Sequence, residues 1–154
     1  IEKLEGENVY SYVHNSVDKY LGKIGVLVSL DGTHDKEIGK QISMHIAATA
    51  PLALSESELD KSLLDRETKV IRDQLIEEGK PPEIIDKIML GKLKKYFEEN
   101  TLLQQKFVMD PDLKVSEFLE KNNQKIIKYK RFKVGEGIEK EETDFAAEVK
   151  GIVS

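Results

Sequence analysis

The sequence predicts an α+β fold, with a small antiparallel three-stranded sheet packed by helices, a protruding antiparallel helical hairpin and a C-terminal helix. Three observations predict it. Apolar residues alternate with a period of two in KIGVLVSL (23–30), two long charged segments flank the turn EEGKPP (77–82), and a small apolar stripe recurs at helical spacing near the end of the chain. With 154 residues and 39% hydrophobic content, the chain can bury a modest core.

Three segments have the pattern of β-strands. The central strand is expected at 23–32, where Ile24, Val26 and Val28 alternate with Gly25, Leu27 and Ser29, so that apolar residues lie on both faces before an Asp-Gly turn signal. The segment 9–14 (VYSYVH) is its expected antiparallel partner. A third strand is expected at 125–134, where β-branched and aromatic residues interleave with cations.

The first predicted helix lies between these strands. Thr33 is expected to cap a helix that begins near Asp35 and ends before Pro51, because the residue before a proline disfavours the α region. Its second half, QISMHIAATA (41–50), is apolar on nearly every side. A helix of this kind is usually covered on more than one face.

Two longer helices follow, at 55–79 and 82–98. Ser55 and Glu58 have the spacing of a capping box, and Gly79 is expected to end the first helix. Each helix carries one apolar stripe, so the pair is expected to form a projecting antiparallel hairpin whose first arm is ~35 Å long. Two helices lying flat on the sheet are the alternative, because periodicity does not say what covers a buried face.

A short helix is expected after the turn Asp110-Pro111, capped by Ser116 or Asp112. Its inward residues would be Val115, Phe118 and Leu119. The chain therefore divides into an expected core subdomain (1–54 and 101–134), a coiled-coil hairpin (55–100) and a C-terminal module (135–154).

The composition of the chain excludes several classes of function. The net charge of −5 opposes a general electrostatic attraction to nucleic acid. The absence of cysteine excludes thiolate metal sites and cysteine nucleophiles, and makes the cytoplasm the default location. No apolar run approaches the roughly 20 residues of a membrane span. Because the chain begins at Ile1 and not at Met, we expect it to be a processed or truncated piece.

The motifs of common enzymes are missing from the sequence. The glycines at 135 and 137 resemble the start of a dinucleotide fingerprint, but Lys140 replaces its third glycine. The three histidines, His14, His34 and His45, lie on different predicted elements, which argues against a metal site. We therefore expect no enzymatic activity, no cofactor and no metal.

Two features are open to two interpretations each. His45 lies in an apolar helix, where it is either a core histidine bonded to a backbone carbonyl or a contact to a partner. The strand around Lys128 combines cations with Tyr129 and Phe132, a pattern that also occurs in RNA-binding modules. Alternation would divide these cations between the two faces of the sheet, so an exposed strand with protective charges is the better interpretation.

Several blocks resemble a known family. KIGVLVSL, GKQISMHIAATAP, RETKVIRDQLIEEGKPPEIIDKIMLGKLKKYFEENTLLQQKFVMDP and YKRFKVGEGIEKEETDFAAEV occur in the order found in the C-terminal part of bacterial elongation factor Ts. The resemblance covers nearly the whole chain. It implies a guanine-nucleotide exchange factor that binds the GTPase elongation factor Tu, promotes GDP release during translation elongation and catalyses no reaction itself.

The resemblance also implies which residues bind the partner. The block SMHIAA contributes Met44 and His45, and the block FVM contributes Val108 and Met109. The C-terminal module would add a docking helix with Asp144, Phe145, Glu148 and Val149. Simple core packing is an equally open interpretation of Met44 and Met109.

One departure from the family bears on activity. The family's N-terminal module and the first half of its core, with the TDFV motif whose Phe wedges near the magnesium site of the GTPase, have no counterpart here. Thr143-Asp144-Phe145 repeats three of those letters but belongs to another block. We therefore expect this chain to bind the GTPase and to accelerate GDP release weakly or not at all. A homodimer through the hairpin is a further possibility that the family allows.

Overall fold

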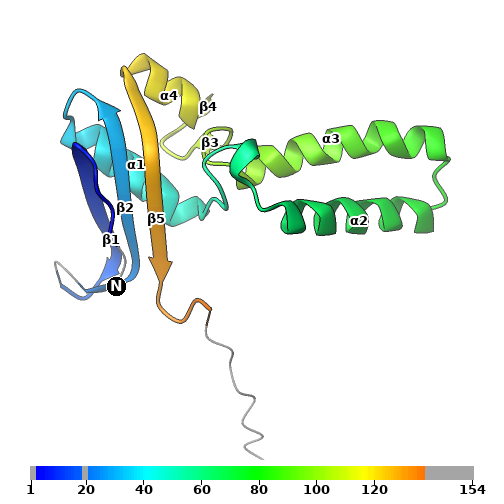
Figure 1. The fold of residues 1–154 in the computed structure, drawn as a ribbon, viewed down its shortest axis with the longest axis horizontal. Helices are drawn as coiled ribbons and strands as arrows, with labels where there is room; N and C mark the ends of the chain where they lie inside the picture. Colours follow the sequence, from blue (N-terminus) through cyan, green and yellow to red (C-terminus); the bar gives the residue numbers. More distant parts are fainter. Residues whose placement is uncertain (1–2, 19–20, 138–154) are drawn as a thin grey trace, which may run out of the picture.

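The computed structural model describes residues 3–18 and 21–137, which fold as an α+β protein (Figure 1). Its main sheet has the order β1-β2-β5, with β1 (Asn8–Ser16) and β5 (Gln124–Lys133) both antiparallel to the central β2 (Gly22–Gly32). The three strands predicted from alternation are therefore confirmed. Each is a few residues longer than, or shifted by a residue from, the predicted range.

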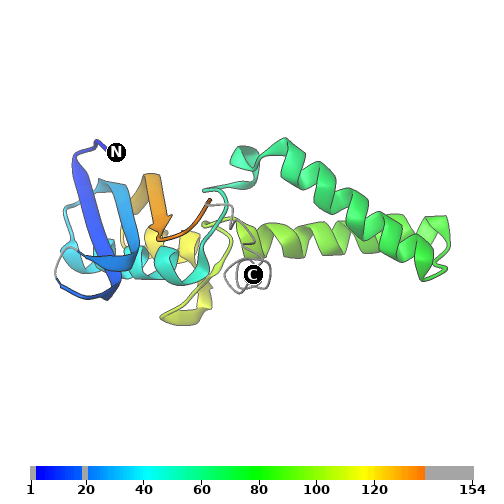
Figure 2. The same cartoon turned by 90° about the horizontal axis from the view of Figure 1, so that it is seen from below.

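Helix α1 (Lys36–Thr49) covers one face of the sheet (Figures 1 and 2). Its cap corrects the prediction, because the carboxylate of Asp35, and not Thr33, accepts the free N–H groups of the first turn. The helix ends before Pro51 as predicted. Gly39 allows a close approach to β1, because a Cβ there would lie 2.2 Å from the ring of Tyr10.

Helices α2 (Lys61–Glu77) and α3 (Pro82–Asn100) form an antiparallel hairpin that projects away from the sheet (Figure 1). The alternative of two helices lying flat on the sheet is therefore wrong. Gly79, with φ of +70°, ends α2 in a Schellman motif, in which the N–H of Lys80 donates to the carbonyl of Leu75.

The start of α2 corrects another prediction. Ser55 makes no capping hydrogen bond; a short 3-10 helix, Glu56–Glu58, follows it, and Asp60 caps α2 by accepting from the N–H of Ser62. The predicted capping box at 55–58 is therefore wrong, because a second cap-competent residue begins the helix farther along the chain. With 17 residues, the arm is ~26 Å long instead of ~35 Å.

The hairpin returns to the core beside the segment that leaves it. The carbonyls of Ala53 and Leu54 accept from the N–H groups of Leu102 and Leu103, and Ala53 pairs with Thr101. A two-stranded ribbon follows, with β3 (Lys106–Phe107) and β4 (Asp110–Lys114). This ribbon lies between the base of the hairpin and α4.

Helix α4 (Val115–Lys121) packs against β5 beside α1 (Figure 1). Neither Ser116 nor Asp112 caps it, contrary to prediction. The side chain of Glu117 instead reaches back to accept from the N–H of Lys114 over 2.7 Å. Val115 and Leu119 are buried as predicted, and Phe118 is partly buried against the same core.

The core lies between the sheet, α1, α4 and β3. Its buried residues come from all these elements and from the turn after α3, which contributes Leu102: Tyr10, Val26, Val28, Leu30, Ile38, Ile42, Ile46, Ala47, Leu102, Phe107, Val115, Leu119 and Ile126. The predicted C-terminal helix falls outside the described residues.

Candidate partner-binding site

The turn between β3 and β4 displays two apolar side chains. Phe107 pairs with Asp110, which leaves Val108 and Met109 as a two-residue turn. Their exposed fractions are 51% and 43%. Of the four residues predicted for this surface from the FVM and SMHIAA blocks, these two are accessible. Met109 is thus not a core residue, which was the other interpretation of it.

The residue before the turn is anchored in the core. Phe107 is 1% exposed, and its ring stacks on Phe118 with centroids 4.2 Å apart. It also lies 5.7 Å from the ring of His45. Phe107 therefore points into the core. Its packing holds the start of the turn in place, and the side chains of Val108 and Met109 extend from the turn into solvent.

His45 is in the core and not on the surface. Its side chain is fully buried, its Nε2 lies 2.9 Å from Oε1 of Gln105, and its Nδ1 accepts from the backbone N–H of Val108 over 3.2 Å. Burial lowers the pKa of His45, and the bond to Gln105 raises it by a smaller amount. The structure agrees with the core interpretation, although its partners are a side-chain amide and an N–H instead of the expected backbone carbonyl.

Of the other predicted residues, Met44 lies within the described part of the chain and the four C-terminal residues do not. Met44 is half-buried on α1, where it points about 100° around the helix from His45. Asp144, Phe145, Glu148 and Val149 lie outside the described residues. The structure therefore brings together Val108, Met109 and, through a backbone hydrogen bond, His45.

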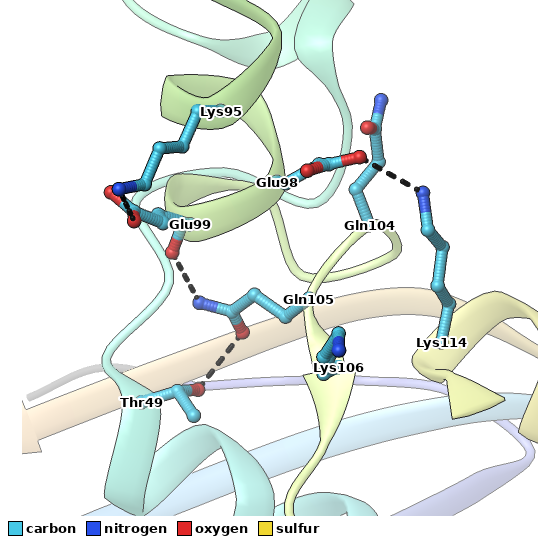
Figure 3. Close-up of a pocket in the computed structure, with 8 residues that line it drawn as sticks. All are labelled: Thr49, Lys95, Glu98, Glu99, Gln104, Gln105, Lys106 and Lys114. Carbon is cyan, nitrogen blue, oxygen red and sulfur yellow. Dashed lines mark hydrogen bonds and ion pairs between the residues drawn. The ribbon is translucent and has the colours of Figure 1, made fainter. Parts of the chain in front are cut away.

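A pocket of about 560 Å³ lies next to this site, where the hairpin joins the core (Figure 3). In the close-up, Gln105 lies between the end of α3 and Thr49 of α1. Ion pairs cross or border the pocket, Lys114 with Glu98 at 3.5 Å and Lys95 with Glu99 at 3.7 Å. These charges largely compensate one another, so the pocket has no strong attraction for a small charged ligand.

The pocket also identifies a residue that sequence reasoning missed. Gln105 is 5% exposed and is hydrogen-bonded through both ends of its amide. No local signal in the sequence marks this burial, because LLQQKF does not alternate and the neighbouring Gln104, with the same side chain, is only partly buried. A buried amide in such a segment needs a polar partner.

The basic strand offers less to RNA than its composition indicates. Lys128 and Lys130 lie opposite Ser29 and Leu27 on one face, and Arg131 lies opposite Val26 on the other, so the predicted division of cations is confirmed. A register shift on β5, where Ile127 is the extra residue, precedes them.

Two other groups of that strand, Arg131 and Tyr129, are used inside the molecule, whereas Phe132 is 41% exposed. Arg131 lies 3.5 Å from the carbonyl of Ala47 in the last turn of α1, where a cation is favourable. Tyr129 donates to the carbonyl of Pro51 over 2.8 Å, and burial raises its pKa to about 12. Neither side chain is free to stack on a base or hold a phosphate.

Residues 3–18 and 21–137 offer no cluster of metal ligands. No group of three or more His, Cys, Asp or Glu side chains in these ranges could hold a metal ion.

The helices of residues 3–18 and 21–137 lack the features of a membrane span. None combines the length and the apolar character that crossing a bilayer requires.

Comparison with known proteins assigns the chain to a family. The model of the family described as Elongation factor TS matches residues 1–136. Proteins named Elongation factor Ts from Paracoccus denitrificans (strain Pd 1222) and Dinoroseobacter shibae are 52% and 51% identical to it, over 97% of this chain and 51% of each relative. The relative from Ruegeria sp. (strain TM1040) is 50% identical, over 96% of the chain and 50% of its own length. The chain thus spans about half the length of these curated relatives, and it belongs to the elongation factor Ts family.

Proposed function

We propose that this chain is the partner-binding half of a guanine-nucleotide exchange factor and that its partner is the GTPase elongation factor Tu. Family membership supports the choice of partner. The observation that carries the assignment to this half is the exposed pair Val108 and Met109, presented on a turn anchored by buried side chains. Met is enriched in protein interfaces, and most of the binding energy comes from a few side chains near the centre of the contact.

The proposed activity is binding and not catalysis. An exchange factor acts by differential affinity, because it binds the nucleotide-poor conformation of the GTPase more tightly than the GDP-bound one. This chain would supply part of the binding energy, in the cytoplasm where translation takes place. The wedge that opens the nucleotide site would belong to the half of the family's sequence that has no counterpart here.

The proposed contact surface has a central and a peripheral part. Val108 and Met109 would make the central apolar contact, and the half-buried Met44 of α1 would contribute a further apolar side chain. His45 would act from below, through its hydrogen bond to the N–H of Val108. The C-terminal module (135–154), with Asp144, Phe145, Glu148 and Val149, would add a second contact to the GTPase.

We also propose that the hairpin can pair with a second copy of this chain. The hairpin leaves apolar side chains exposed along its length: Leu63 at 40%, Val70 at 45%, Ile84 at 46%, Ile76 at 57% and Leu90 at 73%. Their burial against a partner hairpin would be favourable. Sedimentation at increasing concentration tests this, since a mass that stays monomeric would argue against it.

Release of fluorescent GDP from elongation factor Tu, followed by stopped flow, tests the main proposal. We expect the chain to bind the GTPase while accelerating release weakly or not at all. Acceleration equal to that of a full-length family member would contradict the assignment of the wedge to the other half. Low sensitivity of binding to salt would further distinguish an apolar protein interface from binding to RNA.

A further inference from the structure

The hydrogen bonds around His45 have a direction that backbone groups set at both ends. The N–H of Val108 can only donate, so Nδ1 of His45 must accept from it. The carbonyl of Glu99 can only accept, so Nε2 of Gln105 donates to it over 2.8 Å, which leaves Oε1 facing His45. Nε2 of His45 therefore carries the ring proton and donates to that oxygen over 2.9 Å.

A third side chain completes this network. The hydroxyl of Thr49 lies 2.9 Å from Oε1 of Gln105 and also 2.9 Å from the carbonyl of His45. His45 is fully buried and Gln105 is 5% exposed, so water competes little for these bonds. A buried polar network whose members are all paired is rigid and selects one arrangement.

The turn above the network needs support from outside. Two-residue hairpin turns that match strand twist require a positive φ, and neither Val108 nor Met109 has one. β3 is two residues long, and its pairing with β4 shifts register between Lys106 and Phe107. Strand pairing alone therefore stabilises this turn weakly, and the hydrogen bond from Val108 to His45 adds a contact with the core.

We propose that Gln105 is the positioning residue of the Val108–Met109 turn. By holding His45 in the Nε2–H tautomer, it keeps Nδ1 available as the acceptor for the turn. Its own bond to the carbonyl of Glu99 connects the turn to the last residues of α3, at the base of the hairpin (Figure 3). We call the hydrogen bonds that run from Glu99 through Gln105 and His45 to Val108 the relay. The relay is a property of this chain, and only its effect on partner binding rests on the proposed function.

The adjacent glutamine provides a matched control. Gln104 has the same side chain but points the other way, where its amide bonds to Glu56 on the surface. Gln105→Met keeps the length of the side chain and removes its hydrogen bonds to His45, Thr49 and Glu99. Gln104→Met makes the same chemical change outside it.

The first experiment uses NMR on the 15N-labelled 154-residue chain without any partner. The ring nitrogens of wild-type His45 should report the Nε2–H tautomer. In Gln105→Met this signature should be lost, and the Val108 amide should exchange with solvent about tenfold faster, while Gln104→Met leaves both unchanged. An Nδ1–H tautomer in the wild type, or unchanged exchange in Gln105→Met, would overturn the proposal.

A variant of the histidine keeps the test valid if Gln105→Met folds poorly. His45→Asn places an amide oxygen near the position of Nδ1, so the Val108 amide should stay protected, whereas His45→Leu should expose it. Equal exchange rates in these two variants would contradict a role for His45 as acceptor. The amide of Val28, in the central strand, serves as the reference for global folding.

The second experiment measures binding to elongation factor Tu. Gln105→Met should weaken binding about tenfold and Gln104→Met should leave it unchanged, because only the former frees the turn. Equal affinities would show that the relay does not position the contact surface. If wild-type chain does not bind the GTPase, the proposed function fails, and the NMR experiment still decides whether the relay exists.

Discussion

In the core, α1 buries Ile42, His45 and Ile46 completely, whereas in the hairpin α2 buries Ile71 and Leu75 along one narrow stripe. The residues that meet this stripe from α3 are Ile85 and Met89, with Ile88 and Leu93 partly buried beside them. One ion pair, Arg72 with Asp86 at 3.1 Å, crosses between the two arms and is exposed. Exposed ion pairs of this kind contribute little to stability.

The difference indicates how the two regions divide their tasks. The core holds buried polar groups in fixed positions, and it can therefore present the Val108–Met109 turn in one conformation. In the hairpin, one apolar stripe of α2 packs against one of α3, and the other faces of both helices are in solvent. We therefore expect the hairpin to open locally without unfolding of the core.

Ile42→Ala should have the largest effect on stability. Ile42 is fully buried between α1 and the sheet, so its truncation leaves a cavity and should lower the free energy of unfolding by about 4 kcal/mol. Urea denaturation of the whole chain measures this. Ile127→Ala, at a position that is 53% exposed, is the control and should change stability little.

Leu75→Ala should weaken the hairpin alone. Leu75 is 2% exposed within a thin seam, and its truncation should destabilise the hairpin by about 3 kcal/mol. Amide exchange should accelerate in α2 and α3 and remain unchanged in β2, with Val70→Ala as the exposed control. If the β2 amides accelerate equally, the two regions unfold as one and the comparison is wrong.

Acidification should destabilise the core by a smaller amount. Burial lowers the pKa of His45 below its ordinary value of 6.5, so below that pH the unfolded chain binds a proton that the native chain does not. The free energy of unfolding should therefore be highest above about pH 6.5, fall as the pH drops below it, and level off below the lowered native pKa. His45→Asn lacks this titration, and its unfolding should lose that part of the pH dependence. An identical pH profile in both proteins would contradict the buried neutral histidine.

Periodicity predicted the elements because each has a strong, local pattern. The period of two identified β2, and the charged helices around EEGKPP identified the hairpin and its glycine stop. Whether the hairpin projects depends on what covers it. That is a tertiary property, and the sequence could not settle it.

Helix starts were less predictable because several nearby residues can serve as caps. Thr33 and Asp35 are both competent, as are Ser55 and Asp60, and the choice depends on the backbone conformation of the preceding turn. For α4, the cap comes from Glu117 inside the helix.

The candidate site depends on a contact between residues that are far apart in the sequence, which local patterns do not predict. The apolar helix around His45 predicted that its side chain is buried in the core, but its hydrogen-bond partner Gln105 is 60 residues away in the chain. No local pattern joins two such residues. The resemblance to the family selected Val108 and Met109, and the structure adds that they are exposed while His45 is not.

The central claim is that the chain binds a translation GTPase through the Val108–Met109 turn. The most direct measurement is calorimetric titration of nucleotide-free elongation factor Tu with the wild-type chain and with a Val108→Ser, Met109→Ser double variant. We expect saturable binding of the wild type and at least about tenfold weaker binding of the double variant, which should be equally stable because both side chains are exposed in the free chain. No binding by a folded wild-type chain, or equal affinity of the double variant, would contradict it.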